Sequence, residues 1–237
     1  MGILSVRMKS LYDIEISEAQ ENLLVSYLSA ILEVNKTINL TRIISQEEGL
    51  VSHLEDSLTG FPYLQNAPQG LYGDLGTGGG FPGVPLGIVS GRETVLIDSV
   101  KKKVKVLDDT LTKLHLSDSF HVYAGRIEDL AVEQRGAFSA VTARALSSLA
   151  SLLELASPLL CRGGRLICYK ARPSQEEITQ ASKIEAFLGM KNILSHSFVL
   201  SDNSQRCILV YEKISQSHIV LPRRVGMAQK HPFEHPC

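Results

Sequence analysis

Apolar residues near the start of the chain recur with the period of an amphipathic helix. Four of them occupy positions i, i+3, i+4 and i+7, namely Leu24, Tyr27, Leu28 and Ile31. Ser17 and Gln20 precede them at the spacing of a capping box, so we predict a helix that begins at Ser17 and ends near Asn35. A second helix is predicted over residues 46–58. Residues 1–70 are therefore expected to form a helical cap that lies outside the sheet.

From Leu71 onward, short apolar segments alternate with helical ones. The segments typical of strands are 94–97, 120–124, 138–142, 165–169, 193–200 and 207–211. The helical segments are 100–114, 149–160 and 176–188. This alternation predicts an α/β domain over residues 71–214, with a mostly parallel sheet and a closing hairpin. Residues 215–237 lack periodicity and are predicted to be a basic tail.

A glycine-rich stretch follows the first predicted strand, Asp74-Leu75-Gly76-Thr77-Gly78-Gly79-Gly80-Phe81-Pro82-Gly83. Glycine permits positive φ and lets a ligand approach the bare backbone, so we predict a cofactor-binding loop. Phe81 replaces the third glycine of the dinucleotide fingerprint and no Gly-Lys-Ser/Thr follows, which excludes an NAD motif and a P-loop. An acidic residue followed by G-x-G-x-G resembles the first motif of the class I S-adenosyl-L-methionine (AdoMet) methyltransferases.

Other polar groups are predicted at the sheet edge that carries this loop, because the carboxyl ends of parallel strands meet there. Asp98 ends the second strand, 22 residues after Gly76, where a carboxylate can accept from both hydroxyls of a ribose. Ile127 and Glu128 follow the third strand and suit the ring and the polar edge of an adenine. Arg144 follows the fourth strand. An ordinary helix start at Glu128 and a surface arginine at position 144 are the alternatives.

Composition excludes several classes of protein. The net charge of −1 gives no general attraction to polyanions, so nucleic-acid binding would need a local basic patch. Cys161, Cys168, Cys207 and Cys237 show no C-x-x-C pair and no histidine at ligand spacing, so we expect reduced thiols in a cytoplasmic protein and no metal site. Early charged residues argue against a signal peptide, and no apolar run reaches membrane-spanning length.

Three polar segments have both a structural and a functional interpretation. The asparagines of residues 35–41 can form turns or contact a substrate. His53, on the second predicted helix, can be a packed histidine or part of a site. Residues 221–232 contain prolines, glycine and basic residues, and they can be solvated or contact phosphates.

Together the motifs resemble those of the RsmG family, also called glucose-inhibited division protein B. The matching segments span nearly the whole chain: Asn35–Thr41 (N-K-x-x-N-L-T), His53–Leu58 (H-L-x-D-S-L), Asp74–Gly83 (D-L-G-T-G-x-G-F-P-G), Leu96–Ser99 (L-I-D-S), Ala143–Ala145 (A-R-A) and Leu221–Pro232 (L-P-R-R-x-G-x-x-x-K-x-P). Two positions depart from the family pattern: Gly79, where Ala, Ser or Pro is frequent, and Ala171, where Gly is usual. The resemblance implies a class I, Rossmann-like methyltransferase fold, with the helical cap and the basic tail as additions.

The resemblance also implies AdoMet as methyl donor and methylation of guanine N7 in the 16S RNA of the small ribosomal subunit. The implied cofactor contacts are Gly76, Phe81, Asp98, Ile127, Glu128 and Arg144, to which the close backbone approach expected in the loop adds Gly78. The candidates for RNA contact are Asn35, Lys36, Asn39, His53, Asp56, Lys170, Arg223 and Arg224.

The implied reaction requires no catalytic base, because N7 of neutral guanine already carries a lone pair. We therefore predict a positioning mechanism in which Arg144 contributes electrostatically. A small-molecule methyltransferase with a helical lid and a non-catalytic ribosome-binding protein that retains AdoMet are the alternatives. A monomer without metal or membrane partners is expected.

Overall fold

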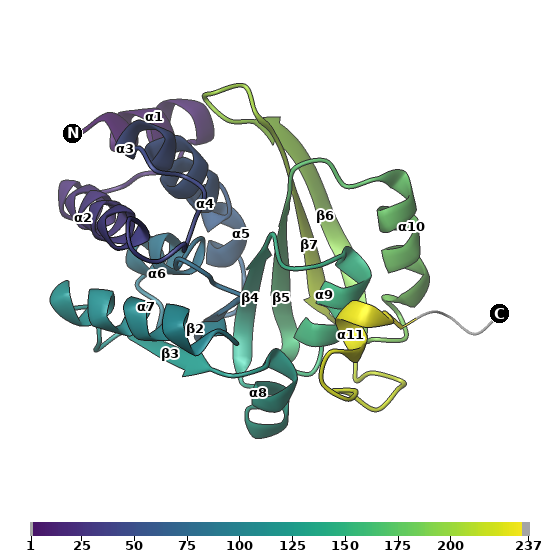
Figure 1. The fold of residues 1–237 in the computed structure, drawn as a ribbon. Helices are drawn as coiled ribbons and strands as arrows, with labels where there is room; N and C mark the ends of the chain where they lie inside the picture. Colours follow the sequence, from purple (N-terminus) through teal and green to yellow (C-terminus); the bar gives the residue numbers. More distant parts are fainter. Residues whose placement is uncertain (1, 234–237) are drawn as a thin grey trace.

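The computed structural model describes residues 2–233, which build a seven-stranded sheet covered by helices on both faces (Figure 1). The strands are β1 (Leu71–Leu75), β2 (Thr94–Asp98), β3 (Phe120–Ala124), β4 (Phe138–Arg144), β5 (Leu160–Lys170), β6 (Met190–Val199) and β7 (Gln205–Lys213). Their order is β3-β2-β1-β4-β5-β7-β6. Strands β1 to β5 pair in parallel, and β7 is antiparallel to β5 and β6, which confirms the predicted sheet and hairpin. The strand order reverses between β1 and β4, where such sheets bind ligands.

The helices separate into two layers (Figure 1). One face of the sheet carries α1 (Ile3–Tyr12), α2 (Glu18–Asn35), α5 (Phe61–Gln65), α6 (Gly83–Ser90) and α7 (Lys101–Lys113). The other face carries α8 (Ile127–Glu133), α9 (Leu149–Ala156), α10 (Gln175–Ile184) and α11 (Met227–Lys230). Successive side chains of a strand point to opposite faces, so each layer has its own apolar core.

The N-terminal cap contains two helices that were not predicted, α1 and α5. Helix α1 escapes the prediction because its apolar residues do not share one face: Leu4 and Met8 are buried, whereas Ile3 is exposed. Its first backbone N–H groups are satisfied by the Glu21 carboxylate, which accepts from Gly2 at 2.9 Å and from Leu4 at 2.8 Å. In helix α2, the capping box is confirmed.

The predicted second helix is present, but its geometry is not uniform. It consists of α3 (Gln46–Gly49), the π-helix η1 (Leu50–Glu55) and α4 (Asp56–Leu58). The wider π-turns change which side chains share a face, so the α-helical periodicity predicted over 46–58 is wrong in the middle. Such π segments are frequent at functional sites.

Two predicted boundaries around β5 are wrong. Helix α9 ends at Ala156 instead of Leu160, and β5 begins at Leu160 instead of Arg165. Gly163 has φ +81, and the register between β4 and β5 is irregular between Phe138 and Ala140. A glycine bulge thus lets one strand continue through a segment that seemed to break it.

Residues 215–233, which were predicted to belong to a tail, are folded onto the rest of the protein. They contain α11, which contacts α9, and both Leu221 and Ala228 are buried. Cys161, Cys168 and Cys207 carry free thiols, and Cys237 lies outside the described residues. Within residues 2–233, we find no helix with the length and apolarity needed to cross a bilayer.

Candidate active site

The glycine-rich loop is held in place by the buried Asp74 at the end of β1. Its carboxylate accepts hydrogen bonds from Thr77 Oγ1 (2.6 Å), the Gly83 N–H (3.0 Å) and Thr142 Oγ1 (2.7 Å). Burial raises the pKa of Asp74 to about 6, and the three hydrogen bonds oppose that rise because they favour the ionised form. Asp74 therefore braces the loop against β4.

The loop is joined to β2 through Asp98. Gly76 and Gly78 have φ +69 and +57, which glycine adopts without strain. The Gly78 N–H donates to Asp98 Oδ2 at 3.0 Å, and the Val100 N–H donates to Oδ1 at 2.8 Å. Each carboxylate oxygen has two lone pairs, so Asp98 keeps acceptor capacity for ribose hydroxyls.

A cavity of about 230 Å³ lies at the carboxyl ends of β1, β2 and β4. Four predicted cofactor residues line it: Gly76, Asp98, Ile127 and Glu128. Nine further residues line the cavity that are not among the predicted contacts, including Lys103, Leu146, Leu155 and Gln229.

The lining of this cavity fits a nucleoside. Ile127, Leu146 and Leu155 supply apolar contact for a base, while Asp98 supplies acceptors for a sugar. Glu128 is buried and accepts a hydrogen bond from the Gly226 N–H at 2.7 Å, so the C-terminal segment reaches this site. The residues present thus match the nucleoside half of AdoMet.

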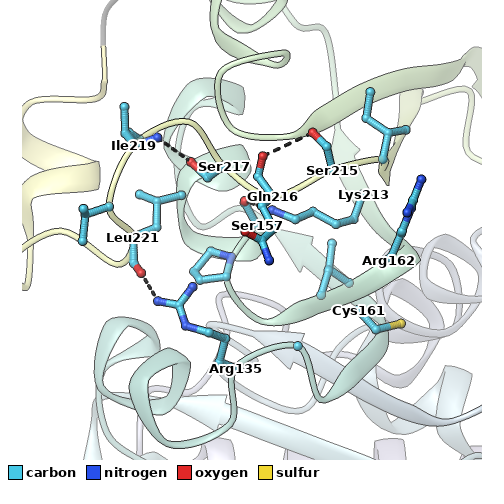
Figure 2. Close-up of a pocket in the computed structure, with 15 residues that line it drawn as sticks. Arg135, Ser157, Cys161, Arg162, Lys213, Ser215, Gln216, Ser217, Ile219 and Leu221 are labelled. Atoms are coloured by element: carbon cyan, nitrogen blue, oxygen red, sulfur yellow. Dashed lines mark hydrogen bonds between the residues drawn. The ribbon is translucent and has the colours of Figure 1, made fainter.

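A larger cavity of about 720 Å³ lies at the opposite edge of the sheet, around the start of β5 and the end of β7 (Figure 2). Arg135, Arg162 and Lys213 line it. Burial, with Arg135 nearby, lowers the pKa of Lys213 to about 8. The predicted cofactor contacts Gly76 and Asp98 line the smaller cavity instead, which we call the cofactor cavity.

Beside the cofactor cavity, the cap contacts the sheet through a compact polar cluster. Ala145 lines the cavity, and the preceding residue, Arg144, extends to the cap. Its Nη1 donates to the Ser52 carbonyl at 3.0 Å and to Asp56 Oδ2 at 2.9 Å. The rings of His53 and Phe81 stack with centroids 4.3 Å apart. Arg144 and Phe81 therefore lie at the junction with the cap and do not line the cavity.

His53 is neutral at this junction. Burial and the Arg144 guanidinium lower the pKa of His53 to about 3. Because arginine can only donate, the contact from Arg144 Nη2 to His53 Nδ1 at 3.3 Å makes Nδ1 the acceptor. Nε2 then carries the proton and donates to Thr41 Oγ1 at 3.0 Å, which ties His53 to the loop after α2.

Several candidate RNA contacts are occupied by other parts of the protein. The Asn35 amide accepts from the Leu40 and Thr41 N–H groups and donates to the Thr41 carbonyl, so it shapes the loop after α2. Asp56 is buried between Arg144 and Arg206, which donates to it at 3.0 Å.

The remaining candidates divide by exposure. Lys170 is partly buried and donates to Glu177 at 2.6 Å, and Arg223 is paired with the buried Glu154. The side chains at the surface are those of Lys36, Asn39 and Arg224. Among the predicted RNA contacts, the structure thus distinguishes residues that a ligand could reach from residues that already have partners within the protein. The sequence alone does not show this difference.

Gly78→Val is expected to weaken AdoMet binding at least tenfold. A β-branched residue at φ +57 is strained by about 1–2 kcal/mol. Within the protein an added Cβ meets only the Gly76 carbonyl oxygen, at 3.9 Å, so the side chain is expected to occupy space that the cofactor needs. Gly79→Ala is the matched control, since an added Cβ there meets its nearest atoms at an ordinary 3.6–3.7 Å. Isothermal titration measures the AdoMet affinity of both variants. Equal affinities would show that the loop does not contact the cofactor.

The reversal of strand order at β1 and β4, the glycine-rich loop and the carboxylate that ends β2 define a class I AdoMet-dependent methyltransferase. The fold is shared with an O-methyltransferase from Bacillus cereus solved with SAH, which aligns over 89% of this chain and 97% of its own at TM-score 0.57 and 16% identity. The tRNA methyltransferase TrmK of B. subtilis aligns over 70% and 67% at TM-score 0.51 and 16% identity. At such identities these likenesses show the fold alone.

Comparison of the amino-acid sequence with known proteins shows the family of this chain. The family model described as rRNA small subunit methyltransferase G, GidB, matches residues 20–207. Proteins named ribosomal RNA small subunit methyltransferase G are 34% identical in Streptococcus suis, over 93% of this chain and 94% of the relative, and 37% identical in Oenococcus oeni, over 92% and 91%. The chain therefore belongs to the GidB family of AdoMet-dependent methyltransferases, which confirms the resemblance seen in its motifs.

Proposed function

We propose that this enzyme methylates N7 of a guanine in the 16S RNA of the small ribosomal subunit. The observation that carries the proposal is the contact between the cofactor cavity and the cap: Ala145 lines the cavity, and Arg144 next to it binds the cap at Asp56. A substrate bound at this junction would lie beside the methyl donor. The names of the relatives support ribosomal RNA as that substrate.

We assign the cofactor contacts to the residues around the cavity. When bound, AdoMet supplies an electrophilic methyl group on its sulfonium. Asp98 would hold the ribose, and Ile127 and Glu128 would hold the adenine, while the backbone at Gly76 and Gly78 allows close approach. N7 of neutral guanine already carries a lone pair, so no side chain has to remove a proton. The work of the protein is then to orient both reactants and keep water out.

The RNA is proposed to approach from the cap side. In an RNA duplex the N7 edge faces a groove too deep and narrow for side chains, so the target guanine must lie in a loop or be turned out. Lys36, Asn39 and Arg224 are exposed and would contact the RNA directly. The buried candidates Asn35, His53 and Asp56 would act through the surfaces that they hold in place. The partly buried Lys170 and Arg223, both in ion pairs, would act in the same way.

We further propose that one chain is sufficient for activity and that it acts in the cytoplasm, where ribosomal RNA, its proposed substrate, is located. The 16S RNA can be presented to the enzyme as naked RNA or within the assembled small subunit. The assay below includes the two forms side by side.

The test is transfer of a tritiated methyl group from AdoMet. The purified protein is incubated with small subunits or with deproteinised 16S RNA, and the RNA is digested to nucleosides and separated by chromatography. We expect label in 7-methylguanosine. An unmethylated substrate is needed, so RNA from cells that lack the activity is used and RNA from wild-type cells is the control.

The other outcomes have defined meanings. Label in another nucleoside would overturn the assignment of N7. Label found only in small metabolites would indicate a small-molecule methyltransferase. AdoMet binding by calorimetry without transfer to any RNA would indicate a ribosome-binding protein that retains the cofactor.

A further inference from the structure

The segment 221–233 is anchored at its start by Arg135. Figure 2 shows the Arg135 guanidinium directed at the Leu221 carbonyl, to which it donates a hydrogen bond. Leu221 itself is buried in the apolar core beside α9. The chain is thus fixed where it leaves the larger cavity.

A second anchor is the pair of Arg223 and Glu154. Two guanidinium nitrogens of Arg223 donate to the two carboxylate oxygens of Glu154, each at 2.6 Å. Glu154 is 2% exposed and lies on α9, so its charge depends on this bidentate partner. Arg223 also donates to the His231 carbonyl at 2.7 Å, and the Phe233 N–H donates to Glu154 at 3.1 Å. The ion pair therefore closes the segment into a loop that contains α11.

Between these anchors, the segment reaches the cofactor cavity at two points. The Gly226 N–H donates to Glu128 Oε1 at 2.7 Å, from a residue with φ +81. One turn further on, Gln229 lines the cavity together with Ile127 and Glu128. In Figure 1, α11 lies beside α9 and above α8, the helix that begins with these two residues.

We propose that residues 221–233 are a wall of the cofactor site, with Gln229 as a cofactor-contacting residue and Arg223 as a positioning residue. This inference rests on the proposed occupancy of the cavity by AdoMet. Gly226 occupies one oxygen of Glu128, which fixes the carboxylate and leaves the other oxygen for a donor such as an adenine amino group. Two adjacent arginines then have different roles: Arg223 holds the wall, and the exposed Arg224 is free to contact RNA.

Calorimetry with AdoMet in the absence of RNA tests the proposal on the full-length protein. Gln229→Ala is expected to weaken binding about three- to tenfold, as for loss of one hydrogen-bonding side chain. Gln229→Glu is expected to weaken it more, because it places a second carboxylate beside Glu128. Arg223→Gln is expected to weaken binding about tenfold by releasing the wall. Arg224→Gln, the charge-matched control, is expected to bind AdoMet as the wild type does.

A separate measurement isolates the nucleoside end of the cofactor. Methylthioadenosine lacks the amino-acid part of AdoMet, and its affinity is expected to fall by the same factor in Gln229→Ala and Arg223→Gln. Thermal melting identifies variants that are unfolded at the titration temperature. Gln229 lines the cavity but is also exposed to solvent, so its variants are expected to fold and keep the test informative even if Arg223→Gln does not fold.

The outcomes separate this inference from the proposed function. Equal AdoMet affinity in the wild type, Gln229→Ala and Gln229→Glu would contradict the proposal that residues 221–233 form a wall of the cofactor site. The methyltransferase assignment would still stand. A wild-type protein that does not bind AdoMet would overturn the occupancy of the cavity itself. Equal losses in Arg223→Gln and Arg224→Gln would show an effect of net charge and would contradict the positioning role of Arg223.

Discussion

Asp98→Ala is expected to weaken AdoMet binding by about a hundredfold. The substitution removes the acceptor for two ribose hydroxyls and leaves the Gly78 and Val100 N–H groups without their partner. Charge-assisted hydrogen bonds of this kind contribute about 1.5–3 kcal/mol each, and about 2.7 kcal/mol corresponds to a hundredfold change in Kd. Isothermal titration with AdoMet measures the loss.

The matched variants separate the contributions of charge and shape. Asp98→Asn keeps one acceptor oxygen and is expected to fall between the wild type and alanine. Asp108→Ala removes an exposed acid from α7 and is expected to bind normally. Wild-type affinity in Asp98→Ala would place the ribose elsewhere and would invalidate the assignment of the cavity.

Glu55→Ala is expected to lower the free energy of unfolding by about 3–5 kcal/mol, the cost of breaking a buried ion pair from one side. Glu55 is 0% exposed, and its carboxylate accepts from Arg7 (3.1 Å), Tyr12 (2.7 Å), the Ser201 N–H (2.7 Å) and Ser201 Oγ (2.5 Å). These donors belong to α1 and to the turn between β6 and β7. One carboxylate thus holds the first helix and the closing hairpin against the π-helix η1 of the cap.

Urea denaturation followed by circular dichroism measures this effect. Glu48→Ala, an exposed acid on α3 in the same helical run, is the control and is expected to change stability by less than about 0.5 kcal/mol. Glu55→Gln keeps the size and one acceptor, so an intermediate loss is expected. Equal stability of Glu55→Ala and Glu48→Ala would contradict the role of Glu55.

The sequence predicts best where the relevant chemistry is local. The loop at 74–83 and the 22-residue spacing from Gly76 to Asp98 predict a nucleoside site, because the strand, turn and next strand are consecutive in the chain. The structure adds that Asp74 braces the loop from below. In the sequence Asp74 is part of a motif that predicts ligand binding. In the structure, however, its carboxylate accepts all three of its hydrogen bonds from other residues of the protein.

Long-range contacts were beyond the sequence analysis. Glu55 lies within the recognised H-L-x-D-S-L segment, but its partner Ser201 is 146 residues away. Arg223 and Arg224 are identical in type and adjacent, and only the fold shows that the first is paired with Glu154. Arg206 was also missed, since nothing near it in sequence indicates that it reaches Asp56.

The position of the wall residues has a consequence for biosynthesis. A polypeptide is made from its N-terminus, so all seven strands are synthesised before Leu221. Gly226, which donates to Glu128, and the cavity-lining Gln229 follow later still. A nascent chain that has just completed β7 already contains Asp98 and the glycine-rich loop, yet one side of its pocket is missing. If the proposed wall is correct, tight capture of the methyl donor would require synthesis to have passed Gln229.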